Sequence, residues 1–149
     1  MDRFKLVPEA HLLLIRAGRI LLLRRCNTDY EDGKYSVIAG HMEDGETARE
    51  AICREAREEA GIELLPDDLE FAHVVHRADR GQRVGFFFRA RRWRGEPRNM
   101  EPDKADDFRW FALDALPDDM VPYVRRAIEG WRAGQGYSES GWASGPNSR

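Results

Sequence analysis

Residues 40 to 62 read GHMEDGETAREAICREAREEAGI, and this stretch decides how the chain is interpreted. Within it, residues 47 to 60 are rich in Ala, Glu and Arg and contain no Gly or Pro, which favours a helix. Thr47 and Glu50 match a Thr-x-x-Glu capping box, and Gly61 suits the left-handed residue that follows a helix. The sequence therefore predicts one helix with both of its ends marked.

Within five positions this helix carries three carboxylates, Glu55, Glu58 and Glu59. At about 100° per residue, the apolar stripe of the helix is centred on Ile52, and Glu59 lies only about 20° from that centre. A charge held against the core is costly unless a cation or hydrogen-bond donors compensate it. One interpretation is a solvated face laced with ion pairs, which leaves Glu59 unexplained. The other is a site for Mg²⁺ or Mn²⁺, which prefer carboxylate oxygens.

Length, composition and net charge limit the classes of protein to which the chain can belong. The chain has 149 residues, the length of one ordinary domain, with 42% hydrophobic and 34% charged residues and a net charge of -3. This balance fits a soluble globular protein and argues against a dedicated nucleic-acid binder. The chain has only two cysteines, Cys26 and Cys53, without the spacing of a disulfide framework, and it has no signal-peptide or membrane-spanning run. These features predict a cytoplasmic protein.

The rest of the chain reads as strands followed by a second helix. Apolar and β-rich runs predict strands at about 9–16, 19–25, 35–40, 69–78, 82–93 and 108–116. An amphipathic pattern predicts a helix over residues 121–134, and the Gly- and Ser-rich residues 134–149 predict a disordered tail. The order of elements indicates a mixed α/β fold with helices packed against a sheet.

The spacing of the opening stretch is more specific than its helix geometry. Gly40, then Glu46 after five residues, then the run from Arg54 to Ile62 after seven more, match every fixed position of the 23-residue Nudix box. The chain resembles a Nudix hydrolase, a MutT-like nucleotide pyrophosphohydrolase, across about residues 5 to 133. The resemblance implies a Nudix-type α/β/α sandwich over residues 1–133, with a mixed sheet, the box helix and a C-terminal helix. Ile38, Ala39 and His41 depart from the Pro, Gly and Gly of many members.

The resemblance also implies roles for individual residues. Glu58 and Glu59 would be metal ligands, Glu55 a further ligand or the base that deprotonates the attacking water, and the Ala39 carbonyl would complete a site for Mg²⁺ or Mn²⁺. Arg54 would orient these carboxylates. The motif positions Gly40 and Gly61 would serve backbone conformation, and Glu46 would pair across the junction between loop and helix.

A further carboxylate is expected from the loop after the box. Glu101 is favoured as that ligand or base, with Asp107 second among the acids Asp103, Asp106 and Asp107. Arg24, Arg25 and His41 are candidate phosphate contacts, with an exposed role as the alternative. The aromatic candidates for stacking on a base are Tyr30, Tyr35, Phe87 and Trp110.

The expected activity is hydrolysis of a nucleoside diphosphate linked to another moiety. A (deoxy)nucleoside triphosphate cleaved to monophosphate and pyrophosphate is favoured by the short chain and by RWF after an acidic pair. The alternatives are an ADP-ribose or nucleotide-sugar pyrophosphatase, and a non-catalytic Nudix-fold module that binds a nucleotide. The expected partner is a small nucleotide, with no nucleic-acid polymer and no membrane, and a homodimer is left open.

Overall fold

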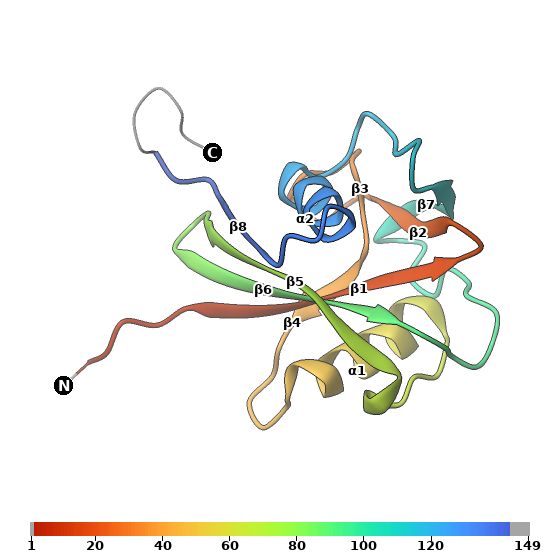
Figure 1. The fold of residues 1–149 in the computed structure, drawn as a ribbon, viewed down its shortest axis with the longest axis horizontal. Coiled ribbons are helices and arrows are strands. Elements are labelled where there is room, and N and C mark those ends of the chain that lie inside the picture. Colours follow the sequence, from red (N-terminus) through yellow and green to blue (C-terminus); the bar gives the residue numbers. More distant parts are fainter. Residues whose placement is uncertain (1, 144–149) are drawn as a thin grey trace.

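Strand β1 (Val7–Arg16) lies at the centre of the sheet in the computed structural model, which describes residues 2–143 (Figure 1). Its first half pairs antiparallel with β4 (Ile38–His41), and its last residues pair antiparallel with β2 (Arg19–Arg25). Strand β6 (Gln82–Ala90) runs parallel to β1 from Val7 to Leu14. A strand covered on both faces requires a continuous apolar run, and the run from Leu12 to Leu14 is fully buried.

The remaining strands extend the sheet on both sides of β1. Strand β5 (Leu69–Ala78) forms an antiparallel hairpin with β6 and follows a short 3₁₀ turn, η1 (Pro66–Asp68). On the other side, β2 pairs antiparallel with β3 (Tyr35–Ser36) and β7 (Ala105–Ala112). The parallel and antiparallel pairs together make the predicted mixed sheet.

Two helices cover opposite faces of this sheet, α1 (Ala48–Ala60) on one and α2 (Pro122–Arg132) on the other (Figure 1). Successive residues of a strand point to opposite faces. Accordingly, Leu12 belongs to the core on the α1 side, which includes Ile52 and Ala56, whereas Leu13 belongs to the core on the α2 side. The Nudix-type α/β/α sandwich is confirmed.

Three predicted strands differ in extent from the observed ones, and one of them, predicted over residues 82–93, ends at Ala90. The strand expected over residues 35–40 is two short strands, because the pairing passes from β2 to β1 on either side of Val37. The strand expected from residue 108 starts at Ala105 instead, in the acidic end of the loop. The ion pair of Asp106 with Arg24, at 2.7 Å, and the hydrogen bond from the Tyr35 hydroxyl to Asp107 tie these acids to β2 and β3.

The prediction of a disordered tail over residues 134–149 is wrong for part of that segment. Residues Tyr137–Ser140 form β8, which pairs parallel with β5. His73, fully buried on β5, is hydrogen-bonded by both ring nitrogens, to the carbonyl of Gln135 and to the hydroxyl of Ser138, each at 2.8 Å. A buried imidazole needs such partners, so this part of the tail completes the β5 edge. Residues 144–149 of the predicted tail lie outside the described residues.

Among residues 2–143, neither helix has the length and apolarity that a bilayer crossing requires. The cytoplasmic location and the homodimer that was left open stay predictions.

Candidate active site

The carboxylates of the opening stretch lie on α1, whose two ends are closed by local chemistry. The Thr47 side chain accepts a hydrogen bond from the amide of Glu50, and the Glu50 side chain accepts one from the amide of Thr47, at 3.1 and 2.9 Å. Gly61 ends the helix in the left-handed conformation with φ 66°. These caps fix the register in which the carboxylates face β4.

Glu59 is wedged between α1 and β4. Its carboxylate accepts a long hydrogen bond, 3.4 Å, from the amide of Ala39. Burial, the hydrogen bond with the Glu55 carboxyl and the Glu55 charge raise the pKa of Glu59 well above its ordinary value. Two carboxylates this close repel each other when both are ionised, at a cost that a cation would remove.

Arg54 holds the neighbouring carboxylates in place. Its guanidinium donates two hydrogen bonds to Glu46, at 2.6 and 3.0 Å, and one to Glu55, at 2.8 Å. A further donor reaches the carbonyl of His41 at 3.1 Å, and Glu58 is 3.5 Å away. The hydrogen bonds from Arg54 lower the pKa of Glu46 to about 2. The predicted pairing of Glu46 across the junction between loop and helix is present.

Gly40 leaves space for the Glu55 carboxylate. A methyl group placed on Gly40 would lie 2.8 Å from Glu55 Oε2 and closer still to the other carboxyl oxygen. Real Cβ atoms do not approach other atoms so closely. Because Gly40 does not have a positive φ, glycine is required there by the close approach of Glu55. The predicted role for Gly40 in backbone conformation is therefore wrong, whereas Gly61 does adopt the left-handed conformation.

The loop after β6 carries Glu101 to the end of α1. The amide of Met100 donates to the carbonyl of Glu59 at 3.2 Å, and the amide of Arg98 donates to the carbonyl of Ala60 at 3.0 Å, so the loop satisfies carbonyls that the helix end leaves unpaired. Glu101 and Glu59 line the same cavity, of about 240 Å³, together with Ala39. Desolvation and the charges of Glu55 and Glu58 raise the pKa of Glu101.

The other acids considered for this role do not line this cavity. Asp106 pairs with Arg24, and Asp107 pairs with Arg109 at 2.9 Å and accepts a hydrogen bond from the hydroxyl of Tyr35. Asp103 is held through its backbone carbonyl, which accepts a hydrogen bond from the Asn27 side chain at 3.0 Å. Glu101 is thus the loop acid that the fold brings to the carboxylates of α1.

These residues form a suitable donor set for a hard cation. Within residues 2–143, no three His, Cys, Asp or Glu side chains are already close enough together to hold a metal ion. The available donors are nevertheless all oxygens, and Glu55 and Glu59 repel each other in the absence of a positive charge. The residues present therefore fit Mg²⁺ or Mn²⁺ in chemistry, with Glu58 and Glu59 as ligands beside the Ala39 carbonyl.

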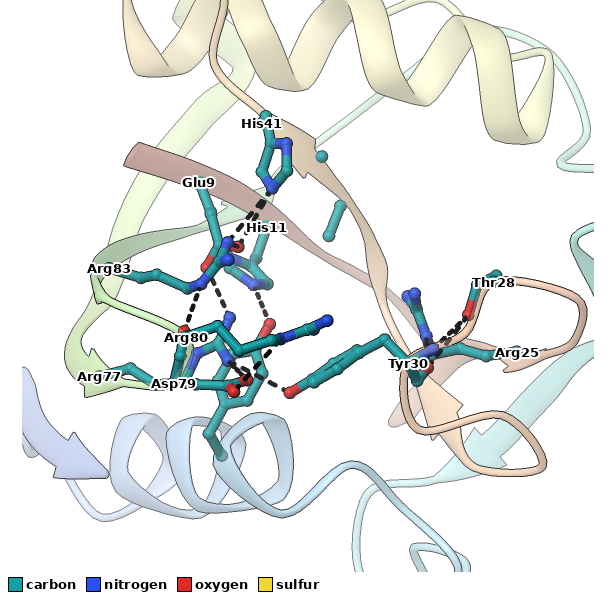
Figure 2. A pocket seen from close by; sticks show the side chains of 13 residues that line it. Glu9, His11, Arg25, Thr28, Tyr30, His41, Arg77, Asp79, Arg80 and Arg83 are labelled. Carbon is teal, nitrogen blue, oxygen red and sulfur yellow. Dashed lines mark hydrogen bonds and ion pairs between the residues drawn. The ribbon is translucent and has the colours of Figure 1, made fainter. Parts of the chain in front are cut away.

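A larger cavity, of about 440 Å³, opens on the other side of Ala39 and Gly40. Figure 2 shows its walls, which come from the start of β1, the loop after β2, the end of β4 and the β5–β6 hairpin. Of the four aromatic candidates for base stacking, Tyr30 alone lines it. Tyr35 and Phe87 are buried in the core, and Trp110 stacks on Trp93 at 6.4 Å between ring centroids.

The candidate phosphate contacts separate in the fold. Arg25 and His41 line the larger cavity, whereas Arg24 is paired with Asp106. Sequence reasoning missed four buried or half-buried polar residues of this cavity: Glu9, His11, Arg77 and Tyr123. The sequence could have pointed to three of them, because Glu9, His11 and Arg77 are polar residues within largely apolar strand sequences.

Arg54→Lys is expected to reduce kcat/KM by about 10- to 100-fold, because a lysine cannot make the two-pronged contact with Glu46 while also holding Glu55. The matched control is Arg57→Lys, an exposed arginine on the same helix. Steady-state kinetics of both variants, at several metal concentrations, would measure the effect. Equal losses in the two variants would show that Arg54 has no positioning role.

Comparisons with known proteins agree with this geometry. A family model described as NUDIX domain matches residues 5–130. NAD-capped RNA hydrolases from Stutzerimonas stutzeri and Pseudomonas aeruginosa (strain LESB58) are 30% and 34% identical to this chain over 119 residues, 76% of its length. The chain spans only 39% and 38% of the length of these two curated relatives.

Solved structures share the fold. The crystal structure of a MutT NUDIX hydrolase from Burkholderia pseudomallei has a TM-score of 0.77 and 33% identity, covering 84% of this chain and 97% of the other. The solution structure of the E. coli ORF135 protein has a TM-score of 0.75 at 24% identity, covering 87% and 91% of the two chains, and shows the fold alone. The family model, which matches most of the chain, establishes that the chain belongs to the NUDIX domain family.

Proposed function

We propose that this chain uses a divalent metal ion to hydrolyse a phosphoric anhydride bond in a nucleotide. Nudix hydrolases act on nucleoside diphosphates linked to another moiety and generally need divalent metal ions. The observation that carries the proposal for this chain is the wedge of Glu59 against Glu55, which leaves negative charge uncompensated beside a cavity. We take Mg²⁺ as the ion, with Mn²⁺ as the alternative.

The roles are those that the Nudix box implies at these positions. Glu58, Glu59 and the Ala39 carbonyl would hold the ion, and Glu55 would add a ligand or accept a proton. When bound, the ion neutralises the pyrophosphate and lowers the pKa of water beside it. Arg54 keeps Glu55 in place at 2.8 Å, and Gly40 leaves room for its carboxylate.

Proton transfer requires a base near the attacking water. The water oxygen bonds to phosphorus, its proton passes to a carboxylate, and the anhydride bond to the leaving phosphate breaks. Glu55 and Glu101 are the two candidates, and desolvation with the neighbouring carboxylates raises the pKa of Glu101, which strengthens Glu101 as a base. Glu101→Gln should therefore remove the acidic limb of the pH–rate profile if Glu101 serves as the base.

A nucleoside triphosphate, cleaved to monophosphate and pyrophosphate, is the first candidate substrate. The relatives named NAD-capped RNA hydrolases favour a second candidate, a pyrophosphate that joins two nucleosides. Because these relatives are more than twice as long as the matched segment, their substrate is carried over here as a proposal. Capped RNA therefore belongs in the test, although no nucleic-acid polymer was expected from the sequence.

The test is a substrate panel with Mg²⁺ and with Mn²⁺. ATP and the common (deoxy)nucleoside triphosphates, ADP-ribose, a UDP-sugar, NAD and a short NAD-capped RNA would be followed by chromatography of the nucleotide products. The Glu58→Gln protein serves as the control for contaminating activity, since it should lose nearly all turnover and keep its fold. If the folded, metal-binding parent protein turned over no member of the panel, the hydrolase proposal would be wrong.

A further inference from the structure

The larger cavity adjoins the carboxylate cavity. Arg25, Thr28 and Ala39 line both. A substrate whose pyrophosphate lies at Glu59 and Glu101 therefore has the larger cavity as its neighbouring space for the next group. What the larger cavity binds would decide which substrates fit.

Positive charge dominates the walls of this cavity. Four guanidinium groups, those of Arg25, Arg77, Arg80 and Arg83, face two carboxylates, those of Glu9 and Asp79. These two carboxylates form ion pairs with two of the arginines, Arg77 and Arg83, which we call the inner arginines. Glu9 pairs with Arg77 at 2.8 Å and with Arg83 at 3.1 Å, and Asp79 pairs with Arg77 at 2.7 Å. The positive charges of the other two arginines, Arg25 and Arg80, which we call the outer arginines, are therefore not balanced by these carboxylates.

The outer arginines have weak partners. Arg80 approaches Asp79 only at 3.6 Å, and Arg25 donates to the backbone carbonyl of Tyr30 at 2.8 Å. No ion pair of Arg25 is found among the residues that the structure describes. Figure 2 shows Arg80 reaching toward Tyr30, with Arg25 beyond the other end of the Tyr30 side chain.

The Tyr30 ring is occupied by cations. The guanidinium carbons of Arg25, Arg77 and Arg80 lie 5.3, 5.7 and 5.1 Å from its centroid. An aromatic ring attracts nearby cations, and Arg77 also donates a hydrogen bond to the Tyr30 hydroxyl at 3.2 Å. The contacts of the Tyr30 ring are therefore with arginines, and stacking of a base on Tyr30 stays a prediction.

Two deeply buried polar side chains of the cavity each have one nitrogen without a hydrogen-bond partner. Arg77 is 5% exposed and its Nε makes no hydrogen bond. His11 is 1% exposed; its Nε2 is 2.8 Å from the hydroxyl of Tyr123, and its Nδ1 lies near the backbone of Phe86 without a hydrogen bond of ordinary geometry. Buried polar atoms are rarely left unpaired, so this wall is built for more than packing.

Backbone strain marks both sides of the same cavity. Asn27, Asp29 and Glu31, in the loop that presents Thr28 and Tyr30, have φ values of 55°, 63° and 51°. Arg80, on the opposite wall, has φ 49°. Such conformations cost energy for residues other than glycine and occur often at functional sites.

We propose that the arginine cavity binds a phosphate group that lies beyond the scissile pyrophosphate of the substrate, with Arg25 and Arg80 as its ligands and Tyr30 as a positioning residue. This inference rests on the proposed hydrolase function. It selects substrates with an additional phosphate, either the terminal phosphate of a triphosphate or the phosphate that follows the first nucleotide of a capped RNA. It selects against ADP, NAD and ADP-ribose, which carry only the pyrophosphate.

The first experiment measures binding without turnover. Inorganic pyrophosphate is titrated by calorimetry into the full chain in EDTA, so that no metal bridges the anion to the carboxylates. Arg80→Gln and Arg25→Gln should each weaken binding by about tenfold, because a hydrogen-bonded ion pair to phosphate is lost. Arg19→Gln, an exposed arginine at the β1–β2 turn that lines neither cavity, should bind as the parent does. No binding by the parent, or equal binding by all variants, would overturn the proposal.

The second experiment compares paired substrates. The ratio of kcat/KM for ATP over ADP reports the terminal phosphate, and the ratio for a short NAD-capped RNA over NAD reports the phosphate of the next nucleotide. At least one ratio should exceed ten in the parent and fall toward one in Arg80→Gln, while Arg19→Gln keeps the parental ratios. Turnover with both ratios near one would overturn the proposal and leave the hydrolase function standing. If pyrophosphate binding needed Arg80 but no substrate were turned over, the phosphate site would stand and the hydrolase function would be overturned.

Discussion

The Glu59→Gln protein is expected to lose about 10³-fold in kcat/KM and, without metal, to unfold at a higher temperature than the parent. Activity is lost because a metal ligand is removed, and the metal stabilises the charge of the transition state by several kcal/mol. Each 1.4 kcal/mol of lost stabilisation lowers the rate about tenfold. The gain in stability reflects the removed repulsion from Glu55. An amide oxygen at position 59 can still accept the Ala39 amide, so packing should be kept.

The pH dependence of unfolding tells whether the ionised Glu59 carboxylate stabilises or destabilises the metal-free protein. The pKa of Glu59 is raised on folding, so the folded protein binds its proton more tightly than the unfolded chain does. Below the ordinary value of 4.5 the carboxyl is neutral in both states and costs nothing. As the pH rises through the folded pKa, the metal-free parent should lose stability relative to Glu59→Gln.

Thermal unfolding in EDTA from pH 4 to pH 8, compared with the same scan in Mg²⁺, would measure this difference. For a chain of this size, each kcal/mol of relieved repulsion should raise the melting temperature by roughly 2–4 °C. The matched control is Glu129→Gln, an exposed acid on α2. A Glu59→Gln protein that is less stable at neutral pH, or that keeps parental activity, would contradict the assignment of Glu59.

Gly40→Ala should produce the second large effect, a loss of about 10²-fold in kcat with a small change in melting temperature. The added methyl group would overlap the Glu55 carboxylate, which Arg54 holds from the other side. The carboxylate is the far end of a flexible side chain, so it can move away without disturbing the core. A displacement of about 1 Å in a positioned catalytic group is enough to cost 10²-fold.

The control for this variant is Gly136→Ala, at a glycine without a positive φ whose added methyl would meet only Phe71, at 4.0 Å. Kinetics and thermal unfolding of both alanine variants should separate the effect on the site from the effect on the fold. If Gly40→Ala kept the parental kcat, the close approach of Glu55 would have no functional consequence.

The features that could be predicted from the sequence are those with local causes. The ends of α1 follow from Thr47, Glu50 and Gly61, which act on backbone groups within four residues of themselves. The conflict at Glu59 also follows from helical periodicity alone, because one apolar stripe and one acidic edge meet on a single helix. The motif spacing then identified the family, since it lies entirely between residues 40 and 62.

Only the tertiary structure decided the features that depend on contacts between distant segments. The docking of Met100 on the end of α1 selected Glu101 from four loop acids, and the pairing of Tyr137–Ser140 with β5 ordered part of the expected tail. The arginine cavity joins β1, the loop after β2 and the β5–β6 turn. The physical reason is range: caps and periodicity act along one helix, whereas hydrogen bonds between residues as far apart as His11 and Tyr123 exist only after the sheet has set their register.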